Sequence, residues 1–266
     1  MLLWWLCDSV NGVNGVNVES SSTAPSYWFQ DTSYNPLYHN QLLAHLALNC
    51  VPKLRMTYFI TNPHTGIHIR MYELDKYNFV AVDVEQSLLS ELIKGRCNET
   101  ITLSSSSVSV SSACINHVIW RVWRSVQADF DTTVRENKLL QRQFYLTGHS
   151  MGGSVATLVG AHLIQIRNKS VHSIVTFGSP PIANALLYRW LVQYTFIKLF
   201  VNEEDPVPRL MSPIYFQPIE LEDHIQPIQS TAHIVQHLVK RNVRNIDSKQ
   251  LLISQHLTYF GLQRCL

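Results

Sequence analysis

The residues 148–153 read Gly-His-Ser-Met-Gly-Gly and place a serine in a Gly-x-Ser-x-Gly pattern. An apolar run precedes the pattern, and apolar residues at helical spacing follow it. On a sharp strand-to-helix turn a serine projects its hydroxyl into open space, and Gly148 and Gly152 are then required because side chains would crowd the turn. The pattern therefore predicts a nucleophile elbow with Ser150 as the nucleophile. The alternatives are a glycine-rich loop with an incidental serine and a phosphate-binding turn.

A serine hydroxyl is a poor nucleophile at neutral pH and needs a nearby base, which histidine supplies when a carboxylate fixes its tautomer. Asp205 is the predicted carboxylate, because it follows an apolar strand in a loop that two prolines stiffen. Glu203, Glu204 and Asp223 are its rivals, and a solvated acidic turn is the structural alternative.

His256 is the predicted base among the 12 histidines of the chain. It lies near the C-terminus and completes the chain order Ser, Asp, His that is typical of a hydrolase with this elbow. His224, His233 and His237 also follow the acid. His233 and His237 share a helical face, which favours a surface or core role for them.

The strands and helices that alternate along the chain must position these residues. Strands alternating with helices indicate a parallel sheet covered on both faces, with sites at the carboxyl ends of its strands. We therefore predict an α/β protein with a mostly parallel central sheet flanked by helices. The predicted strands are 57–61, 67–72, 79–84, 144–147, 172–177 and 196–202, and the predicted helices are 41–50, 115–134, 155–166 and 185–194.

The chain of 266 residues is predicted to form one domain, residues 36–266. Residues 1–35 are expected to be a loop-like N-terminal arm or a partial signal segment. Residues 95–113 contain a serine-rich run and are expected to be a low-complexity insertion without regular structure.

Composition excludes several classes of protein. The net charge of +2 does not fit a nucleic-acid binder, and without an apolar run of 18 residues we predict no transmembrane segment. The five scattered cysteines form no Cys-x-x-Cys pair, and His64 and His68 lack a third ligand, so we predict no metal site. Either reduced core thiols or one long-range disulfide, such as one from Cys265 to the N-terminal region, would fit the cysteines.

The apolar start MLLWWLC and the sequons at Asn98 and Asn168 favour the secretory pathway, with a cytoplasmic location as the alternative.

Four motifs together resemble the class 3 lipases, the family of the fungal triacylglycerol lipases. They are GHSMGG, TFGSPPIAN at 176–184, VNEEDPVPRL at 201–210 and HLTYFG at 256–261, in family order and at comparable spacing. The resemblance covers residues 115–266, and the strand FVAVD near residue 81 extends it back to about residue 55. It implies an α/β-hydrolase fold, no cofactor, a Ser150–His256–Asp205 triad, and hydrolysis of acylglycerols or related lipid esters, with the substrate met at a lipid–water interface.

One segment departs from this family. Its members usually carry a Phe-Arg-Gly-Thr-like stretch that supplies one oxyanion donor, and residues 87–114 show none. The backbone N–H of Met151, supplied by the elbow, is the remaining donor. Three explanations stay open: a weakened enzyme, a divergent donor within residues 85–113, and a misassembled gene model.

The departure also motivates a rival hypothesis, a catalytically silent relative that binds a lipid or a partner in the same cleft. Retention of all three triad residue types argues against it. The sequence does not define the oligomeric state.

Overall fold

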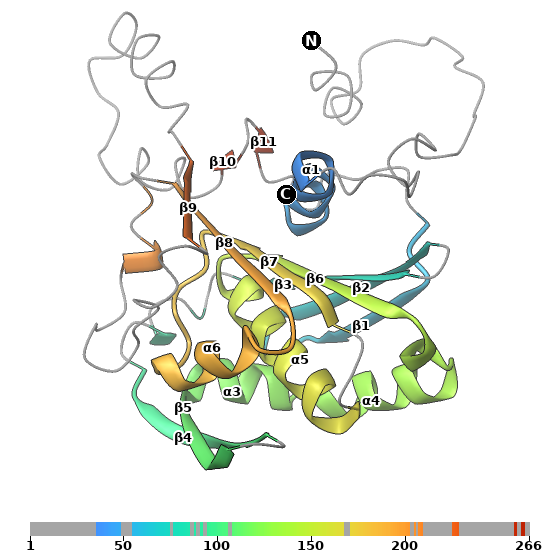
Figure 1. Ribbon diagram of the computed structural model, residues 1–266. Coiled ribbons are helices and arrows are strands. Elements are labelled where there is room, and N and C mark those ends of the chain that lie inside the picture. The colour runs from blue at the N-terminus through green and yellow to red at the C-terminus, as the bar shows by residue number, and fades with distance from the viewer. Residues whose placement is uncertain are drawn as a thin grey trace, which may run out of the picture.

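A seven-stranded sheet forms the centre of the protein in a computed structural model (Figure 1). Its strands, in spatial order, are β1 (Tyr58–Asn62), β2 (Ile67–Leu74), β3 (Tyr77–Val84), β6 (Gln143–His149), β7 (Val171–Phe177), β8 (Phe196–Asn202) and β9 (Ile225–Ile228). The structure describes residues 36–48, 55–74, 77–85, 88, 91–92, 95–105, 108–167, 171–202, 205, 207–209, 225–228, 258–259 and 262–263. The predicted arm at residues 1–35 lies outside them.

The sheet is parallel from β3 to β9, and β1 and β2 add an antiparallel edge. This confirms the predicted α/β class with a mostly parallel sheet. The crossovers from β3 to β6, from β6 to β7 and from β7 to β8 each contain at least one helix, as is usual for connections between parallel strands. The carboxyl ends of β6, β7 and β8 therefore meet at one edge of the sheet.

Helices cover both faces of the sheet. Helix α1 (Pro36–Ala47) packs on one face, against Tyr145 among others, while Phe144 and Leu146 of the same strand contribute to the core on the opposite face. This alternation follows from the two-residue period of a strand. The opposite face carries α3 (His117–Arg124), α4 (Gln127–Glu136), α5 (Met151–Arg167) and α6 (Ala185–Leu191).

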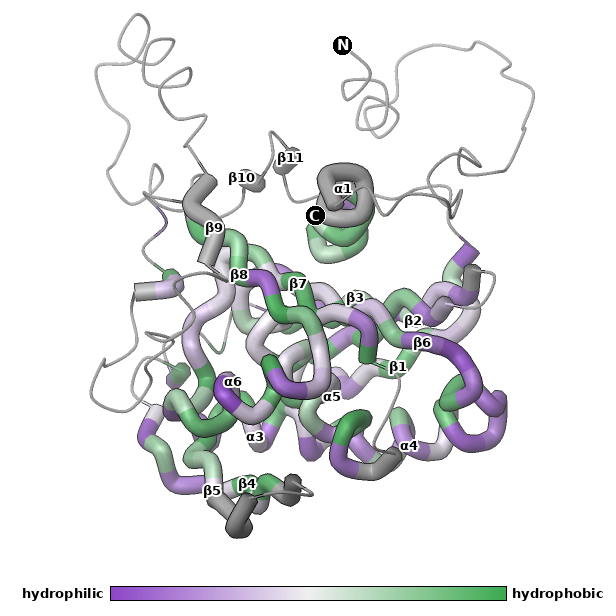
Figure 2. The backbone as a smooth tube through the Cα atoms, viewed as in Figure 1, coloured by the Kyte–Doolittle hydropathy of each residue, from purple (hydrophilic) through white to green (hydrophobic). Residues whose placement is uncertain are grey.

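The pattern of hydrophobicity agrees with these layers. In Figure 2 the described part of α1 is mainly green, whereas α4 carries both green and purple segments. Phe130 and Val134 are the buried residues of α4, and they lie one helical turn apart. Among the described residues, none of the helices has the length and apolar character that a bilayer span requires.

The single helix predicted at residues 115–134 is wrong in one respect, because the structure divides it into α3 and α4. The Asn116 side chain caps the start of α3 by accepting the N–H of Val118 at 2.9 Å. At the break, the carbonyl of Ser125 accepts a hydrogen bond from Asn62 Nδ2 at 3.2 Å, and Ser125 Oγ contacts Thr65 Oγ1 at 2.9 Å. The turn between β1 and β2 thus competes for the polar groups that a continuous helix would use.

The expectation that residues 95–113 lack regular structure is also wrong. Strands β4 (Cys97–Ser105) and β5 (Val108–Asn116) form an antiparallel hairpin there. The alternation of serine with Val108 and Val110 is a two-residue period, which is typical of a strand and was the signal available in the sequence.

A disulfide between Cys97 and Cys114 joins the two strands, with Cα atoms 5.5 Å apart. The sequence-based alternatives for the cysteines did not include this pair. Its members are 17 residues apart in the chain, and only the hairpin brings them together. Cys7, Cys50 and Cys265 lie outside the described residues.

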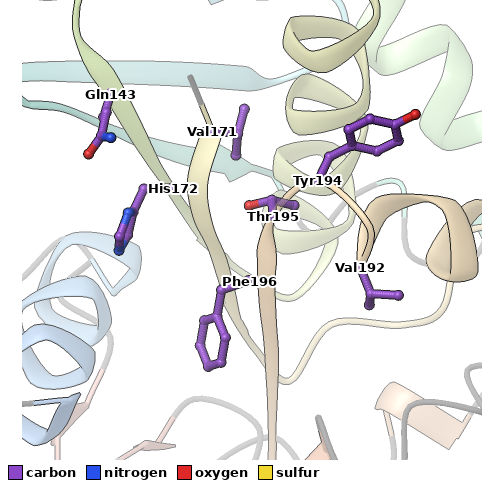
Figure 3. Close-up of a pocket in the computed structure, with 7 residues that line it drawn as sticks. All are labelled: Gln143, Val171, His172, Val192, Tyr194, Thr195 and Phe196. Atoms are coloured by element: carbon purple, nitrogen blue, oxygen red, sulfur yellow. The ribbon is translucent and has the colours of Figure 1, made fainter. Parts of the chain in front are cut away.

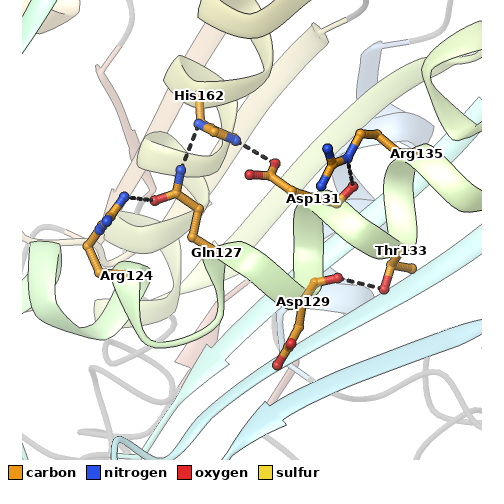
Figure 4. A network of polar contacts seen from close by, with 7 residues as sticks. All are labelled: Arg124, Gln127, Asp129, Asp131, Thr133, Arg135 and His162. Atoms are coloured by element: carbon orange, nitrogen blue, oxygen red, sulfur yellow. Dashed lines mark hydrogen bonds and ion pairs between the residues drawn. The ribbon is translucent and has the colours of Figure 1, made fainter.

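A polar network joins the helices on one face (Figure 4). His162 Nε2 of α5 lies 2.6 Å from Asp131 Oδ1 of α4, and His162 Nδ1 lies 3.3 Å from Gln127 Nε2. Arg124 of α3 donates to Gln127 Oε1 at 2.6 Å. The network fixes α3 and α4 against α5, the helix that follows the elbow.

Removal of the disulfide by Cys97→Ala with Cys114→Ala should lower the free energy of unfolding by about 3 kcal/mol, because the unfolded chain regains the freedom of a loop of this size. Denaturant titration measures the loss. A reductant should destabilise the parent chain by a similar amount and leave the double variant unchanged. Free thiols at both positions in a non-reducing peptide map of the folded chain would disprove the pairing.

Candidate active site

Ser150 occupies the turn between β6 and α5. Its φ angle is 55°, in the left-handed region that residues other than glycine rarely adopt. The Ser150 N–H donates to the carbonyl of Phe177 at the end of β7, 2.9 Å away. The Ser150 carbonyl accepts the N–H of Gly153 at 3.1 Å and so begins the helix. The turn is therefore held by the neighbouring strand on one side and by the helix on the other.

The two glycines of the pattern stand where a side chain has no space. A Cβ atom at Gly148 would lie 2.5 Å from the carbonyl carbon of Gly152 and from the nitrogen of Gly153. A Cβ atom at Gly152 would collide with the carbonyl oxygen of Val82 in β3. The predicted elbow residues thus have the crowding that the prediction assumed.

Asp205 lies beyond the carboxyl end of β8 and is fully buried, with an exposed fraction of 0%. Its Oδ1 accepts the N–H of Val207 at 2.9 Å, in the short 3-10 turn η4 (Val207–Arg209). Strand β7 separates β6 from β8, so two interstrand spacings, about 10 Å, separate their backbones. The fold thus brings the Ser150 and Asp205 segments to the same edge of the sheet.

His256 lies outside the described residues, as do Glu203, Glu204 and Asp223. The described element nearest to His256 along the chain is β10 (Thr258–Tyr259), which pairs with β11 (Leu262–Gln263). The third partner of the predicted triad therefore stays a prediction. Met151, the predicted oxyanion donor, is the first residue of α5, and its side chain is buried.

The loop after β7 borders the elbow and is held from three sides. Ser154 Oγ of α5 donates to the Pro180 carbonyl at 2.7 Å. The N–H of Ile182 donates to the hydroxyl of Tyr188 at 3.3 Å, and burial raises the pKa of Tyr188 to about 12, so this hydroxyl stays neutral. The hairpin also binds the loop, because the N–H of Asn116 donates to the Ile182 carbonyl at 2.8 Å. These contacts were not predicted from the sequence.

A cavity of about 240 Å³ lies beside this loop. Two of its lining hydroxyls, those of Thr176 and Ser179, are buried without a hydrogen-bond partner among the described residues. Ser150 is not one of the described residues that line it. The lining residues are Ser154, Thr157, Thr176, Ser179, Pro180, Pro181, Tyr188, Leu199, Val201 and Pro208.

A wider hollow of about 460 Å³ lies elsewhere (Figure 3). It is lined by Gln143, Val171 and Phe196, which are the first residues of β6, β7 and β8, together with His172, Val192, Tyr194 and Thr195. It therefore lies at the amino ends of the parallel strands, opposite the edge that carries Ser150. Since ligands of parallel sheets bind at the carboxyl ends, we do not place the active site there.

Two features of the site define the α/β-hydrolase class of fold. A serine in the left-handed conformation lies between the buried parallel strand β6 and a helix, and a buried carboxylate follows β8, the second strand from β6 in the sheet. Comparison with known proteins identifies the family within this class. The family "Lipase (class 3)" matches residues 53–215. The chain belongs to the class 3 lipase family, as its sequence motifs indicated.

A curated relative, the secreted mono- and diacylglycerol lipase 1 of Fusarium solani, is 35% identical over 97 residues. That match spans 35% of this chain but only 28% of the relative. The crystal structure of the lipase from Rhizopus microsporus var. chinensis is similar with a TM-score of 0.61 and 19% identity, over 88% of this chain and 90% of that one.

A triacylglycerol lipase described as having a serine-protease triad as its catalytic centre also resembles the chain. Its TM-score is 0.61 and its identity 17%, over 88% of this chain and 97% of that one. At these identities the solved structures show the shared fold. The matched family range ends at residue 215, so it does not include His256.

The elbow makes a matched pair of glycine substitutions informative. Gly152→Ala should lower the free energy of unfolding by about 1–3 kcal/mol, because its Cβ meets the backbone of Val82, which cannot move alone. In Gly160→Ala, on the same helix, the Cβ meets the terminal methyls of Ile174 and Leu146, which can rotate away. Denaturant titration should show Gly160→Ala within about 1 kcal/mol of the parent. Equal losses in the two variants would contradict this account of the elbow.

Proposed function

We propose that the protein hydrolyses carboxylic esters of lipids, and acylglycerols in particular, through a Ser150–His256–Asp205 triad and an acyl-enzyme. The observation that carries the proposal is Ser150 itself, a non-glycine residue held at a φ of 55° between β6 and α5 in a chain of the class 3 lipase family. Such a conformation costs about 1–3 kcal/mol and persists only where the surroundings impose it, which is typical of functional sites.

The proposed reaction has two steps. Ser150 Oγ attacks the ester carbonyl while the imidazole of His256 takes its proton, and the carbonyl oxygen becomes an oxyanion. The carboxylate of Asp205 stabilises the imidazolium, and its anchoring by the N–H of Val207 supports that role. His256 then protonates the leaving alcohol. In the second step water attacks the acyl-enzyme, His256 again acts as base, and the fatty acid and free Ser150 are released.

The oxyanion is proposed to be stabilised by the backbone N–H of Met151, at the first turn of α5. Its position at the positive end of the helix dipole favours a negative charge there. Much of the segment in which the sequence allowed a divergent second donor, residues 85–113, forms strands β4 and β5. The absence of one donor typically costs about 100- to 1,000-fold in rate. With Met151 as the single donor, a slow enzyme is the expectation.

Acylglycerols are the proposed substrate class because the Fusarium solani relative is a mono- and diacylglycerol lipase and a structurally similar protein is a triacylglycerol lipase. The substrate would be met at a lipid–water interface. We also propose secretion. The Cys97–Cys114 disulfide, which is typical of oxidising compartments, and the secreted relative support it.

One observation favours a second candidate, a silent relative that binds lipid without cleaving it. The segment where the family carries its other oxyanion donor is divergent in this chain. A purely binding cleft, however, has no use for a strained serine, so the enzyme is the stronger proposal.

A fluorophosphonate probe separates the two candidates, because it reacts only with an activated serine. The parent chain should be labelled and should hydrolyse p-nitrophenyl esters, and Ser150→Ala should lose labelling and at least about 10,000-fold in kcat. Ser154→Ala, one turn further along α5, is the matched control for labelling. A folded parent chain that the probe leaves unlabelled would favour the silent binder.

The acid and the base can be tested in the same assay. Asp205→Asn should keep the loop, because its amide oxygen can still accept the N–H of Val207, but it should lose about 10,000-fold in kcat because the histidine tautomer is no longer fixed. His256→Ala should lose a similar factor, whereas His237→Ala should stay within a few fold of the parent. If His237→Ala is the inactive variant, the base has been misassigned.

A further inference from the structure

Asn98 begins the sequon Asn98-Glu99-Thr100, which could accept an N-linked glycan. The structure places the whole sequon on strand β4. Asn98 and Thr100 are exposed. Cys97, which precedes Asn98, and Glu99, which lies between the two, are only partly exposed. Both residues that define a sequon are therefore on the solvent side of the hairpin, where a glycan could extend without displacing core side chains.

The backbone at Asn98 departs from the regular ladder. Cys97 pairs with Asn116 and Glu99 pairs with Ile115, so Asn98 is the additional residue of a β-bulge. Its N–H donates to the carbonyl of Arg96, the residue before β4 begins, at 3.1 Å. A bulge turns the local chain away from the flat edge of the strand, so the acceptor side chain is presented on an irregular, exposed segment.

The neighbouring residue supplies an independent observation. Cys97 forms the disulfide with Cys114, and disulfides of this kind form in the oxidising compartment in which N-linked glycans are attached.

We propose that Asn98 is an N-glycosylation site and that its glycan covers the open edge of the β4–β5 hairpin. Among the described strands β4 pairs only with β5, and exposed strand edges invite pairing with other chains. The attached sugar would block such pairing. In chemical terms, the amide nitrogen of Asn98 bonds to the sugar carbon of a lipid-linked donor, whose diphosphate leaves while the amide loses a proton. The proposal rests on the proposed secretory route and is independent of the proposed ester chemistry.

The test uses the full chain behind a yeast secretion signal, in an Asn168→Gln background that removes the other sequon of interest. Thr100→Ser keeps the sequon and Thr100→Ala removes it, while both retain Asn98. The parent and Thr100→Ser should show a mass decrease on treatment with peptide N-glycosidase, and Thr100→Ala should show none. Medium and cell lysate are both analysed, because the glycan is attached before export.

Mass spectrometry of non-reduced peptides should find the Asn98 glycan and the Cys97–Cys114 bond in the same molecules. Unmodified Asn98 in disulfide-bonded parent chain would overturn the proposal, as would an identical mass decrease in Thr100→Ala. Ester hydrolysis is measured on the same samples. A glycosylated chain without hydrolysis would contradict only the proposed function, and an active chain without the glycan would contradict only this inference.

Discussion

The left-handed backbone of Ser150 is the constraint on which the site depends. A serine at a φ of 55° is strained, and the strain is compensated by the hydrogen bond to Phe177 and by the start of α5. The turn can be this tight only because Gly148 and Gly152 have no side chains, and because Gly152 packs directly on the carbonyl of Val82. The Ser150 turn therefore requires three adjacent strands, β3, β6 and β7, in their observed order.

That order also determines where Asp205, the proposed acid, lies. Once β7 is fixed beside β6 by the Ser150–Phe177 hydrogen bond, β8 pairs with the far side of β7, and its carboxyl end delivers Asp205 to the same edge. The N–H of Gly178, a residue with a φ of 58°, donates to the carbonyl of Phe200 and ties the end of β7 to β8. The Ser150 turn and the segment that carries Asp205 thus belong to one hydrogen-bonded edge of the sheet and are not two independently placed loops.

Much of this edge could be predicted from the sequence, because buried parallel strands are short apolar runs with polar boundaries. Strand β8, Phe196–Asn202, has the predicted bounds, and the prediction of the elbow needed only local spacing. The break at Ser125 could not be predicted, because it depends on Asn62, a residue distant in the chain. The Cys97–Cys114 pairing required the hairpin register, and the serine-rich composition concealed it. The assignment of His256 as the base rests on motif spacing and chain order alone.

The segment without the Phe-Arg-Gly-Thr-like stretch is structurally separable from the Ser150 turn. That stretch is missing after β3, within the range that the family matches, whereas Gly152 of the turn packs on Val82 and Asp83 at the end of β3 itself. The β4–β5 hairpin binds a different segment, the loop after β7, at Ile182 and Ala183. A change in the hairpin can therefore alter the loop after β7 while the strained serine stays in place. This separation explains how the chain can keep the Gly-x-Ser-x-Gly turn although it lacks the Phe-Arg-Gly-Thr-like stretch.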